Sequence, residues 1–398
     1  MGILKTITEE YFGNIIREED LIDIHDLNVE IVSFTDNNGK KHRKGYKPKY
    51  INDLKKLLKR MIEVRGDEGD FNDIDTSDIV SMESLFDYNE TFNGDITGWN
   101  VSSVRNMSNI FYNAKSFNQD ISKWNVSGVI YMYGMFWGAS SFNQPIGDWE
   151  FPNVTDMSMC FYNATSFNQP IGDWEFPNVT EMNYMFSYAT SFNQDISKWK
   201  FPNVTDMNSM FYGAKSFNQD ISKWKFPNVK YMKCMFCEAS SFNQEKSKWK
   251  FPNVKDMSSM FSGATSFNQP IGNWEFPNVE DMSSMFSGAT SFNQPIGNWE
   301  FPNVTNMSSM FCEASSFNQD ISKWKFPNVI YMDGMFKEAK SFNQPIGDWK
   351  FPNVRDMNHM FSNATSFNQD LSKWDLKGKN KDEIFDGCPI KDEYKPKM

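Results

Sequence analysis

VTDMSMCFYNATSFNQPIGDWEFPN, residues 154–178, is one copy of a unit that returns along most of this 398-residue chain. Its tryptophan marks the period, because successive copies are 25 residues apart and no step gains or loses a residue. The column comprises Trp99, Trp124, Trp149, Trp174, Trp199, Trp224, Trp249, Trp274, Trp299, Trp324, Trp349 and Trp374. A fixed period of this length is typical of a solenoid, in which one supersecondary unit stacks on copies of itself. The sequence therefore predicts a surface made by repetition.

The first half of the unit has apolar residues at helical spacing. These are Val154, Met157, Cys160, Phe161 and Ala164. The pattern predicts a short helix from Val154 to about Ala164, with its apolar stripe buried. Asn153 stands where an N-cap residue would stand, and Asp156 stands where the carboxylate of a capping box would stand.

The second half of the unit changes to an alternating pattern. Trp174 and Phe176 alternate with Asp173 and Glu175, which predicts a short strand with the rings pointing inward. Parallel strands lie ~4.8 Å apart whereas packed helices prefer ~8–10 Å, so the stack should bend with its strands on the inner side. The predicted fold is an α/β repeat solenoid, an arc of twelve 25-residue coils, each a short helix plus a short parallel strand, with an N-terminal helical cap.

Polar and methionine columns repeat as well. Asn168 and Gln169 recur at the same place in each later coil. They predict a hydrogen-bonded ladder that satisfies turn backbone between layers, with an exposed polar turn as the alternative. Methionines such as Met207 and Met210 are interpreted as filling of the core rather than as an adaptable binding groove.

The chain divides into four predicted segments. Residues 1–48 do not fit the repeat, and Asn38-Gly39 within them suggests a β-hairpin. Residues 49–78 are expected to form a capping helix and a half-repeat, and residues 79–378 the twelve-repeat solenoid. Residues 379–398 are interpreted as a degenerate C-terminal cap and tail.

Composition restricts the partner and the compartment. The net charge of −11 argues against nucleic acid, which needs a basic stripe. No apolar run approaches the ~20 residues of a membrane span, and residues 1–20 lack the apolar region of a secretory signal. Five cysteines make no disulfide framework and favour a reducing compartment. Gly2 lies in a myristoylation pattern that arises often by chance, so its modification stays open.

Candidate catalytic or metal-binding groups are sparse. The three histidines are His25, His42 and His359, and none has a partner that the sequence places in a site. Cys234 and Cys237 form a Cys-x-x-Cys pair, but without two further ligands or a βαβ context it is interpreted as an incidental substitution. The sequence therefore predicts no enzyme, no metal and no cofactor.

Charged residues flank each tryptophan at the two positions that point outward in the predicted strand. Their sign is blocked along the chain: acidic coils, then three basic coils, then acidic, then basic. The candidate binding residues are Asp148, Glu150, Asp173, Glu175, Lys198, Lys200, Lys223, Lys225, Lys248, Lys250, Glu275, Glu300, Lys323 and Lys325. One interpretation is a charge-patterned face that selects a protein partner. The other is that two duplicated subtypes of the unit, QDISKWK and QPIGDWE, carry their charges with them.

The unit V-x-x-M-x-x-M-F-x-x-A-x-x-F-N-Q-x-I-x-x-W resembles the DUF285 repeat of the BspA-like leucine-rich-repeat group. Residues 71–388 carry the resemblance, and MSSMFSGATSFNQPIGNW, at 257–274 and 282–299, reproduces the pattern almost letter for letter. It implies a leucine-rich-repeat-like arc without enzymatic activity. Such repeats occur in mollicutes and other bacteria, in protists and in large DNA viruses, in proteins described as surface or adhesion proteins. This chain has neither a signal peptide nor a lipobox cysteine, which favours an intracellular or viral setting.

These observations predict a non-enzymatic repeat scaffold that binds protein through the charge-patterned strand face. Two alternatives remain: an adhesin-like carbohydrate binder, which requires the tryptophan column to be exposed, and a structural virion or coat component. An enzyme within residues 1–48 is disfavoured, because that segment is too short for a catalytic core. The expected location is intracellular, in the host cytoplasm or in a virion if the source is viral.

Overall fold

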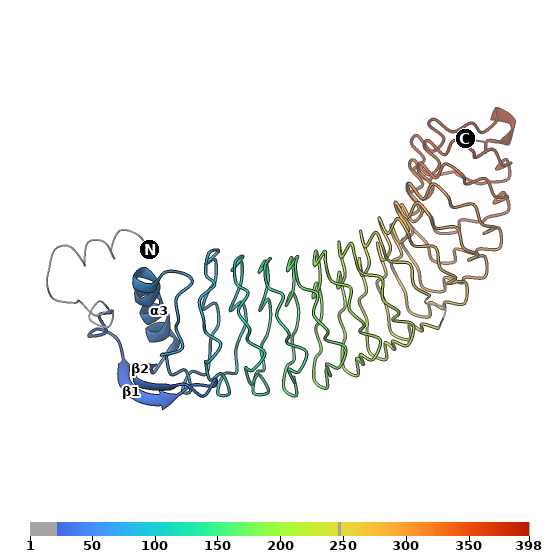
Figure 1. Ribbon diagram of the computed structural model, residues 1–398. Coiled ribbons are helices and arrows are strands. Elements are labelled where there is room, and N and C mark those ends of the chain that lie inside the picture. Colours follow the sequence, from blue (N-terminus) through green and yellow to red (C-terminus); the bar gives the residue numbers. More distant parts are fainter. Residues whose placement is uncertain (1–21, 246–247, 398) are drawn as a thin grey trace.

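The computed structural model describes residues 22–245 and 248–397 of the chain, so Gly2 and its myristoylation pattern lie outside the described residues. The repeats form narrow coils that lie side by side in an elongated solenoid (Figure 1). The solenoid curves toward its C-terminal end, but the spacing mismatch between helices and inner-side strands from which an arc was predicted is absent, because the described repeats contain neither element. Among the described residues, no helix is both long and apolar enough to cross a membrane.

Regular secondary structure is confined to the two ends of the described chain. Strand β1 (Val29–Thr35) and strand β2 (Lys41–Pro48) form an antiparallel hairpin. Helix α3 (Ile51–Arg65) follows at once, and the 3-10 helix η1 (Asp392–Tyr394) lies near the C-terminus. The face of α3 that packs into the hydrophobic core comprises Leu54, Leu57, Leu58 and Met61.

The hairpin is docked on the repeats by its turn. The backbone N–H of Asn37 donates to the carbonyl of Gly98 at 2.9 Å, and its side-chain amide donates to the carbonyl of Trp99 at 2.7 Å. Gly39 adopts a φ of +82°, the left-handed conformation that this turn requires and that glycine adopts without strain. The hairpin and α3 therefore cover the N-terminal end of the stack.

The predicted helix at 154–164 is wrong, because successive tight turns occupy this part of the coil. The N–H of Ala164 donates to the carbonyl of Phe161 at 3.1 Å, which closes one such turn. Met159 and Asn163 have φ values of +57° and +55°, which no right-handed helix contains. A chain of tight turns brings every third or fourth side chain to one face, so it reproduces helical spacing without a helix.

The predicted strand at Trp174 and Phe176 is also wrong, since this leg of the coil has no strand pairing. Parallel pairing instead involves one residue per coil, as where Asp156 bridges Glu181. Beside it, the N–H of Met157 donates to the carbonyl of Glu181 at 3.0 Å. The amide groups of this leg therefore alternate between bonds that close turns within the coil and bonds to the next coil.

The tryptophans point inward, and none of the column is more than 4% exposed. The Trp199 ring stacks on the Trp224 ring with centroids 6.3 Å apart. Its indole N–H donates to the carbonyl of Ile171, in the preceding coil, at 3.0 Å. The methionine columns are buried with them: Met207 and Met210 are both 0% exposed. Most indoles of the column therefore both fill their own coil and bond to the previous one, whereas the buried N–H of Trp149 has no hydrogen-bond partner among the described residues.

The predicted asparagine ladder is confirmed. The side-chain oxygen of Asn168 accepts the backbone N–H of Asn193 at 2.9 Å. The side-chain amide of Gln194 donates to the carbonyl of Asn168, also at 2.9 Å. The same contacts recur from coil to coil, so the Asn-Gln pair of each coil bonds that coil to its neighbour at one corner of the solenoid.

Candidate functional site

The fourteen charged residues singled out in the sequence are all exposed. They flank the buried tryptophans, so the outward orientation is as predicted although the strand is absent. We call these flanking positions the charged face. Tight turns hold the neighbouring corners of each coil, and stacking brings equivalent side chains of successive coils next to one another. The arrangement therefore converts a linear charge pattern into a surface pattern along the solenoid axis.

Ion pairs mark the borders between acidic and basic blocks. Lys198 lies 2.6 Å from the carboxylate of Asp173 in the preceding coil, and Lys250 lies 3.1 Å from that of Glu275 in the following coil. The hydrogen bond to Asp173, and then its charge, raise the pKa of Lys198. Such exposed pairs contribute little to stability. Their effect is to neutralise the edges of the basic block.

The interior of the basic block differs from its edges. Lys200, Lys223, Lys225 and Lys248 are exposed, and the described part of the chain offers them no ion pair. We call these four residues the basic centre. Acidic coils lie on both sides of it along the axis. One acidic wing comprises Asp148, Glu150, Asp173 and Glu175, and the other comprises Glu275 and Glu300, beyond which Lys323 and Lys325 form a second basic coil.

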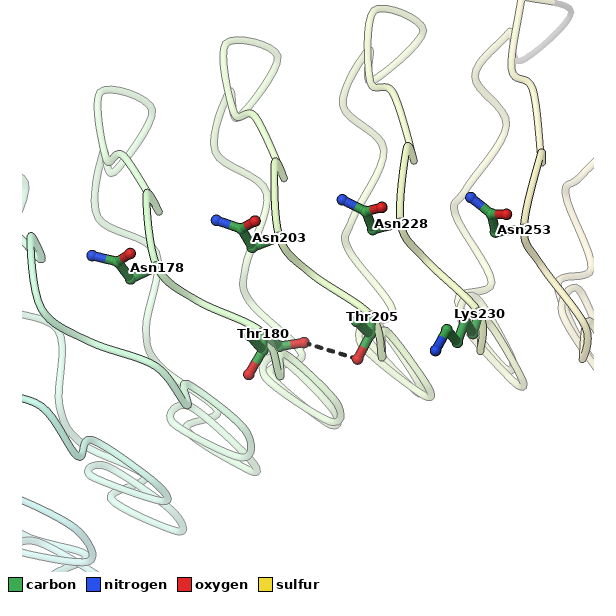
Figure 2. Close-up of a pocket in the computed structure, with 7 residues that line it drawn as sticks. All are labelled: Asn178, Thr180, Asn203, Thr205, Asn228, Lys230 and Asn253. Atoms are coloured by element: carbon green, nitrogen blue, oxygen red, sulfur yellow. Dashed lines mark hydrogen bonds between the residues drawn. The ribbon is translucent and has the colours of Figure 1, made fainter.

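An open groove is lined by residues that come shortly after the charged positions in each unit, and we did not predict it from the sequence. Figure 2 shows its lining: Asn178, Thr180, Asn203, Thr205, Asn228, Lys230 and Asn253. The amide nitrogen of each asparagine points toward the preceding coil, where that of Asn203 donates to the carbonyl of Pro177 at 2.7 Å. The signal was the Pro-Asn pair that opens most units, which we interpreted as a helix cap. In the structure it is a second ladder, and it gives the groove an amide and hydroxyl lining.

Groups that could perform catalysis are scattered. His42 is buried and lies 2.8 Å from the carboxylate of Asp36 in the hairpin, whereas the exposed His359 lies 3.3 Å from Glu383 near the other end. In the ranges 22–245 and 248–397, no group of three or more His, Cys, Asp or Glu side chains is placed to hold a metal ion. The charged face and the groove offer recognition chemistry: ammonium, carboxylate, amide and hydroxyl groups in repeated rows.

Carboxylates occupy the bridging position in several coils, among them Glu181 and Asp206, and they affect stability. Burial raises the pKa of Asp206, and burial together with the charge of Asp206 raises that of Glu181 in the preceding coil. When folding raises the pKa of an acid, the acid lowers the free energy of unfolding at pH values above its folded pKa. This destabilisation disappears as the pH falls below the pKa of the acid in the unfolded chain, which is ~3.9. Asparagine occupies the same position at Asn106 and Asn306, so it fits there.

We therefore expect Asp206→Asn to raise the melting temperature at pH 7, by on the order of 1 °C. The gain should shrink to nothing below about pH 4, where both proteins are neutral at this site. Thermal unfolding of the two proteins at both pH values measures it. Asp195→Asn is the control of opposite sign, because hydrogen bonds from Ser197 lower the pKa of Asp195. A gain of equal size for Asp195→Asn would contradict the explanation.

Comparison with known proteins identifies the repeat. The family described as "Mycoplasma protein of unknown function, DUF285" matches residues 52–171, 144–249, 223–313 and 295–393. No curated protein matches the chain. A solved structure titled "Crystal structure of TLR13-ssRNA13 complex" aligns with 11% identity and a TM-score of 0.25, over 81% of this chain and 53% of that one. The chain thus spans about half of that protein, and so low a TM-score supports no argument. The family matches together cover most of the sequence, and the chain belongs to the DUF285 family.

Proposed function

We propose that this protein is a non-enzymatic repeat scaffold that binds a protein partner through the charged face. One observation carries the proposal: the four exposed lysines of the basic centre form no ion pair with any residue that the structure describes, and they lie between two acidic wings. A uniform coat of mixed charge would keep the protein soluble without selecting a partner. Blocks of one sign select for the complementary sign and steer the encounter, and they reject partners of the wrong sign.

The pattern favours a protein segment with an acidic middle. The basic centre extends over three successive coils, with Trp199 and Trp224 in the first two stacked 6.3 Å apart. An extended segment of only a few residues, at ~3.3 Å per residue, matches that length. The acidic wings would repel a polyanion that continues in either direction, so a short acidic segment with neutral or basic flanks fits better than nucleic acid.

The carbohydrate alternative needs tryptophans that a sugar can reach, and the column is at most 4% exposed. Acrylamide quenching separates the two ideas, because it should leave most of the tryptophan emission intact if the column is inaccessible.

A structural role in a virion or coat is a variant of the scaffold proposal, since it also uses surface recognition. An intracellular setting remains part of the proposal.

The proposed division of the chain also follows the scaffold idea. Residues 79–378 would provide twelve coils, with residues 49–78 and 379–398 shielding the ends and residues 1–48 adding the docked hairpin. The buried leucines of α3 support a role for residues 49–78 as the N-terminal cap. At the other end, Lys379 donates to the carbonyls of Phe351 and Val354 at 2.9 and 2.8 Å, which occupies backbone acceptors of the last coils.

Binding of a fluorescein-labelled hexaglutamate peptide tests the basic centre directly. We expect Lys223→Glu with Lys225→Glu to weaken binding by at least about tenfold at low salt, because each replaced ammonium becomes a repelling carboxylate. Wild-type affinity should itself fall as salt is raised. Fluorescence anisotropy on the full chain measures both effects.

The matched control changes the same charge elsewhere. Lys215→Glu with Lys340→Glu alters two exposed lysines outside the charged face and should weaken binding by less than about threefold, since screening limits long-range effects. Lys223→Arg with Lys225→Arg should bind as the wild type does. Affinity capture from a lysate is then repeated with these variants. Partners of the charged face are the proteins that the wild type and the control reversal capture and the face reversal does not. If the face reversal and the control reversal weaken peptide binding equally, the charged face is not the binding surface.

A further inference from the structure

Cys234 and Cys237 lie at the first and last positions of one of the tight turns that build a coil. The N–H of Cys237 donates to the carbonyl of Cys234 at 3.1 Å, which closes the turn. Cys234 itself has a φ of +54°. The end residues of such a turn have their Cα atoms within about 7 Å, and disulfides join Cα atoms about 4.4–6.8 Å apart. The turn therefore brings two thiols within reach of each other without any change of fold.

The two sulfur atoms are in unequal surroundings. The Cys237 thiol donates a hydrogen bond to the Cys234 sulfur, the Ser259 hydroxyl of the next coil donates another, and Lys233 adds positive charge. These contacts lower the pKa of Cys234 to about 7, in spite of its partial burial. The hydrogen bond that Cys237 donates raises the pKa of that thiol. At neutral pH a large fraction of Cys234 is therefore thiolate, whereas Cys237 stays protonated.

The other cysteines lack this arrangement. Cys160 is 1% exposed, and burial raises its pKa and those of Cys312 and Cys388. Cys312 is the useful comparison, because it occupies the position of the buried Cys237 in its own coil and is partly exposed, as Cys234 is. Serine stands at the Cys234 position in the coil that carries Cys312. Cys234 and Cys312 are therefore both partly exposed, but only Cys234 has a second thiol in the same turn.

We propose that Cys234 and Cys237 form a redox-active dithiol, with Cys234 as the attacking thiolate and Cys237 as the resolving thiol, that is oxidised by low-molecular-weight disulfides. The Cys234 thiolate attacks one sulfur of a disulfide R–S–S–R, the S–S bond breaks, and a thiolate RS⁻ leaves. Cys237 then attacks the Cys234 sulfur, its proton passes to the second leaving thiolate, and the Cys234–Cys237 bond forms. The first RS⁻ takes up the proton that Cys234 released to solvent on ionising, so overall the dithiol loses two electrons and two protons and R–S–S–R becomes two R–SH.

This inference replaces the interpretation of the pair as an incidental substitution. A Cys-x-x-Cys motif lowers a thiol pKa at the start of a helix in other folds. Here a tight turn and a serine from the adjacent coil supply the hydrogen bonds that a helix end would supply. The turn lies on the outside of the solenoid, so a small disulfide can approach the half-buried Cys234.

Alkylation of the full-length protein by iodoacetamide under native conditions tests the thiolate. Peptide mass spectrometry should show Cys234 reacting at least about tenfold faster than Cys312 at pH 7, with a pH profile whose midpoint lies near 7. Glutathione disulfide should convert the wild type to a form in which the 234–237 peptide has lost two hydrogens, and dithiothreitol should reverse the change.

Serine variants separate the two roles and should fold, because Ser259 and Ser262 stand at the same two positions in the next coil. Cys237→Ser should stop at a mixed disulfide of glutathione with Cys234, whereas Cys234→Ser should leave Cys237 unmodified. Cys237→Ala, which removes the hydrogen-bond donor as well, should shift the pH midpoint of Cys234 alkylation upward. Equal alkylation rates at Cys234 and Cys312, or a mixed disulfide that persists in the wild type, would overturn the proposal.

Discussion

Replacing Trp199 by alanine is expected to lower the free energy of unfolding by about 3–5 kcal/mol, the range for removing a large buried aromatic side chain. The ring is 2% exposed and lies between the rings of Trp174 and Trp224, at 6.4 and 6.3 Å. Phe176 adds an edge-on contact at 4.8 Å. The cavity would open in the middle of a continuous stack, where neither neighbouring coil can collapse into it. Urea unfolding followed by the fluorescence of the remaining tryptophans measures the loss.

Trp199→Phe is the control for this experiment. It keeps an aromatic ring in the stack but loses the indole N–H that bonds the carbonyl of Ile171 at 3.0 Å. Its expected cost is about 1–3 kcal/mol, the range for leaving a buried polar group unpaired. The loss for Trp199→Phe combines the unpaired carbonyl with the smaller ring, and the further loss for Trp199→Ala reports the packing of the remaining ring. A loss below about 1 kcal/mol for Trp199→Ala would mean that the ring is not enclosed between coils.

The second large effect is expected at the asparagine ladder. Asn193→Ala removes the oxygen that accepts the backbone N–H of Asn218 and the side-chain amide of Gln219, both at 2.9 Å. The Asn218 N–H would keep no acceptor at a partly buried site, so we expect a loss of about 1–3 kcal/mol in the free energy of unfolding. The same urea experiment measures it.

Asn193→Asp tests whether the accepting oxygen is what matters. A carboxylate accepts both bonds, so this variant should stay within about 1 kcal/mol of the wild type at pH 7. Bonds to the carboxylate lower its folded pKa, so their contribution is present above the unfolded value of ~3.9 and is lost as the pH falls through the folded pKa. The variant should therefore fall behind the wild type only in acid. If aspartate is as damaging as alanine at pH 7, the ladder depends on the amide nitrogen.

The sequence predicts that successive units stack side by side and which side chains fill the interior, because both follow from the 25-residue period. A bulky residue such as Trp224 that returns at a fixed interval, flanked by charged residues, has no stable place except inside a repeated section. An asparagine at one offset, as at Asn168, similarly indicates a bond repeated between layers. Both predictions depend only on equivalent residues meeting, whatever the backbone conformation between them.

The backbone of the coil could not be deduced in the same way. Apolar spacing of three and four residues is shared by helices and by consecutive tight turns, so the spacing at 154–164 does not distinguish them. One signal did: Gly213 and Gly263 stand at the Asn163 position of later coils, where φ is +64° and +68°. Glycine inside a short helix costs up to ~1 kcal/mol, so its recurrence argued for a left-handed position. The charged face was predicted correctly as an exposed set, but the adjoining groove was not, because Pro-Asn also begins helices.

The hydrogen bonds between coils run along the axis of the solenoid, as where Met157 bonds to Glu181, and this determines how the protein responds to tension. A pull on the two ends loads the successive interfaces between coils in series, and at each interface these bonds bear the load together with the stacked rings. A terminal coil has a neighbour on only one side. Coils should therefore peel from an end one after another, each releasing a similar length of chain at a similar force. Under a steady pull the chain would therefore lengthen in steps of similar size, because neighbouring coils are joined by similar contacts.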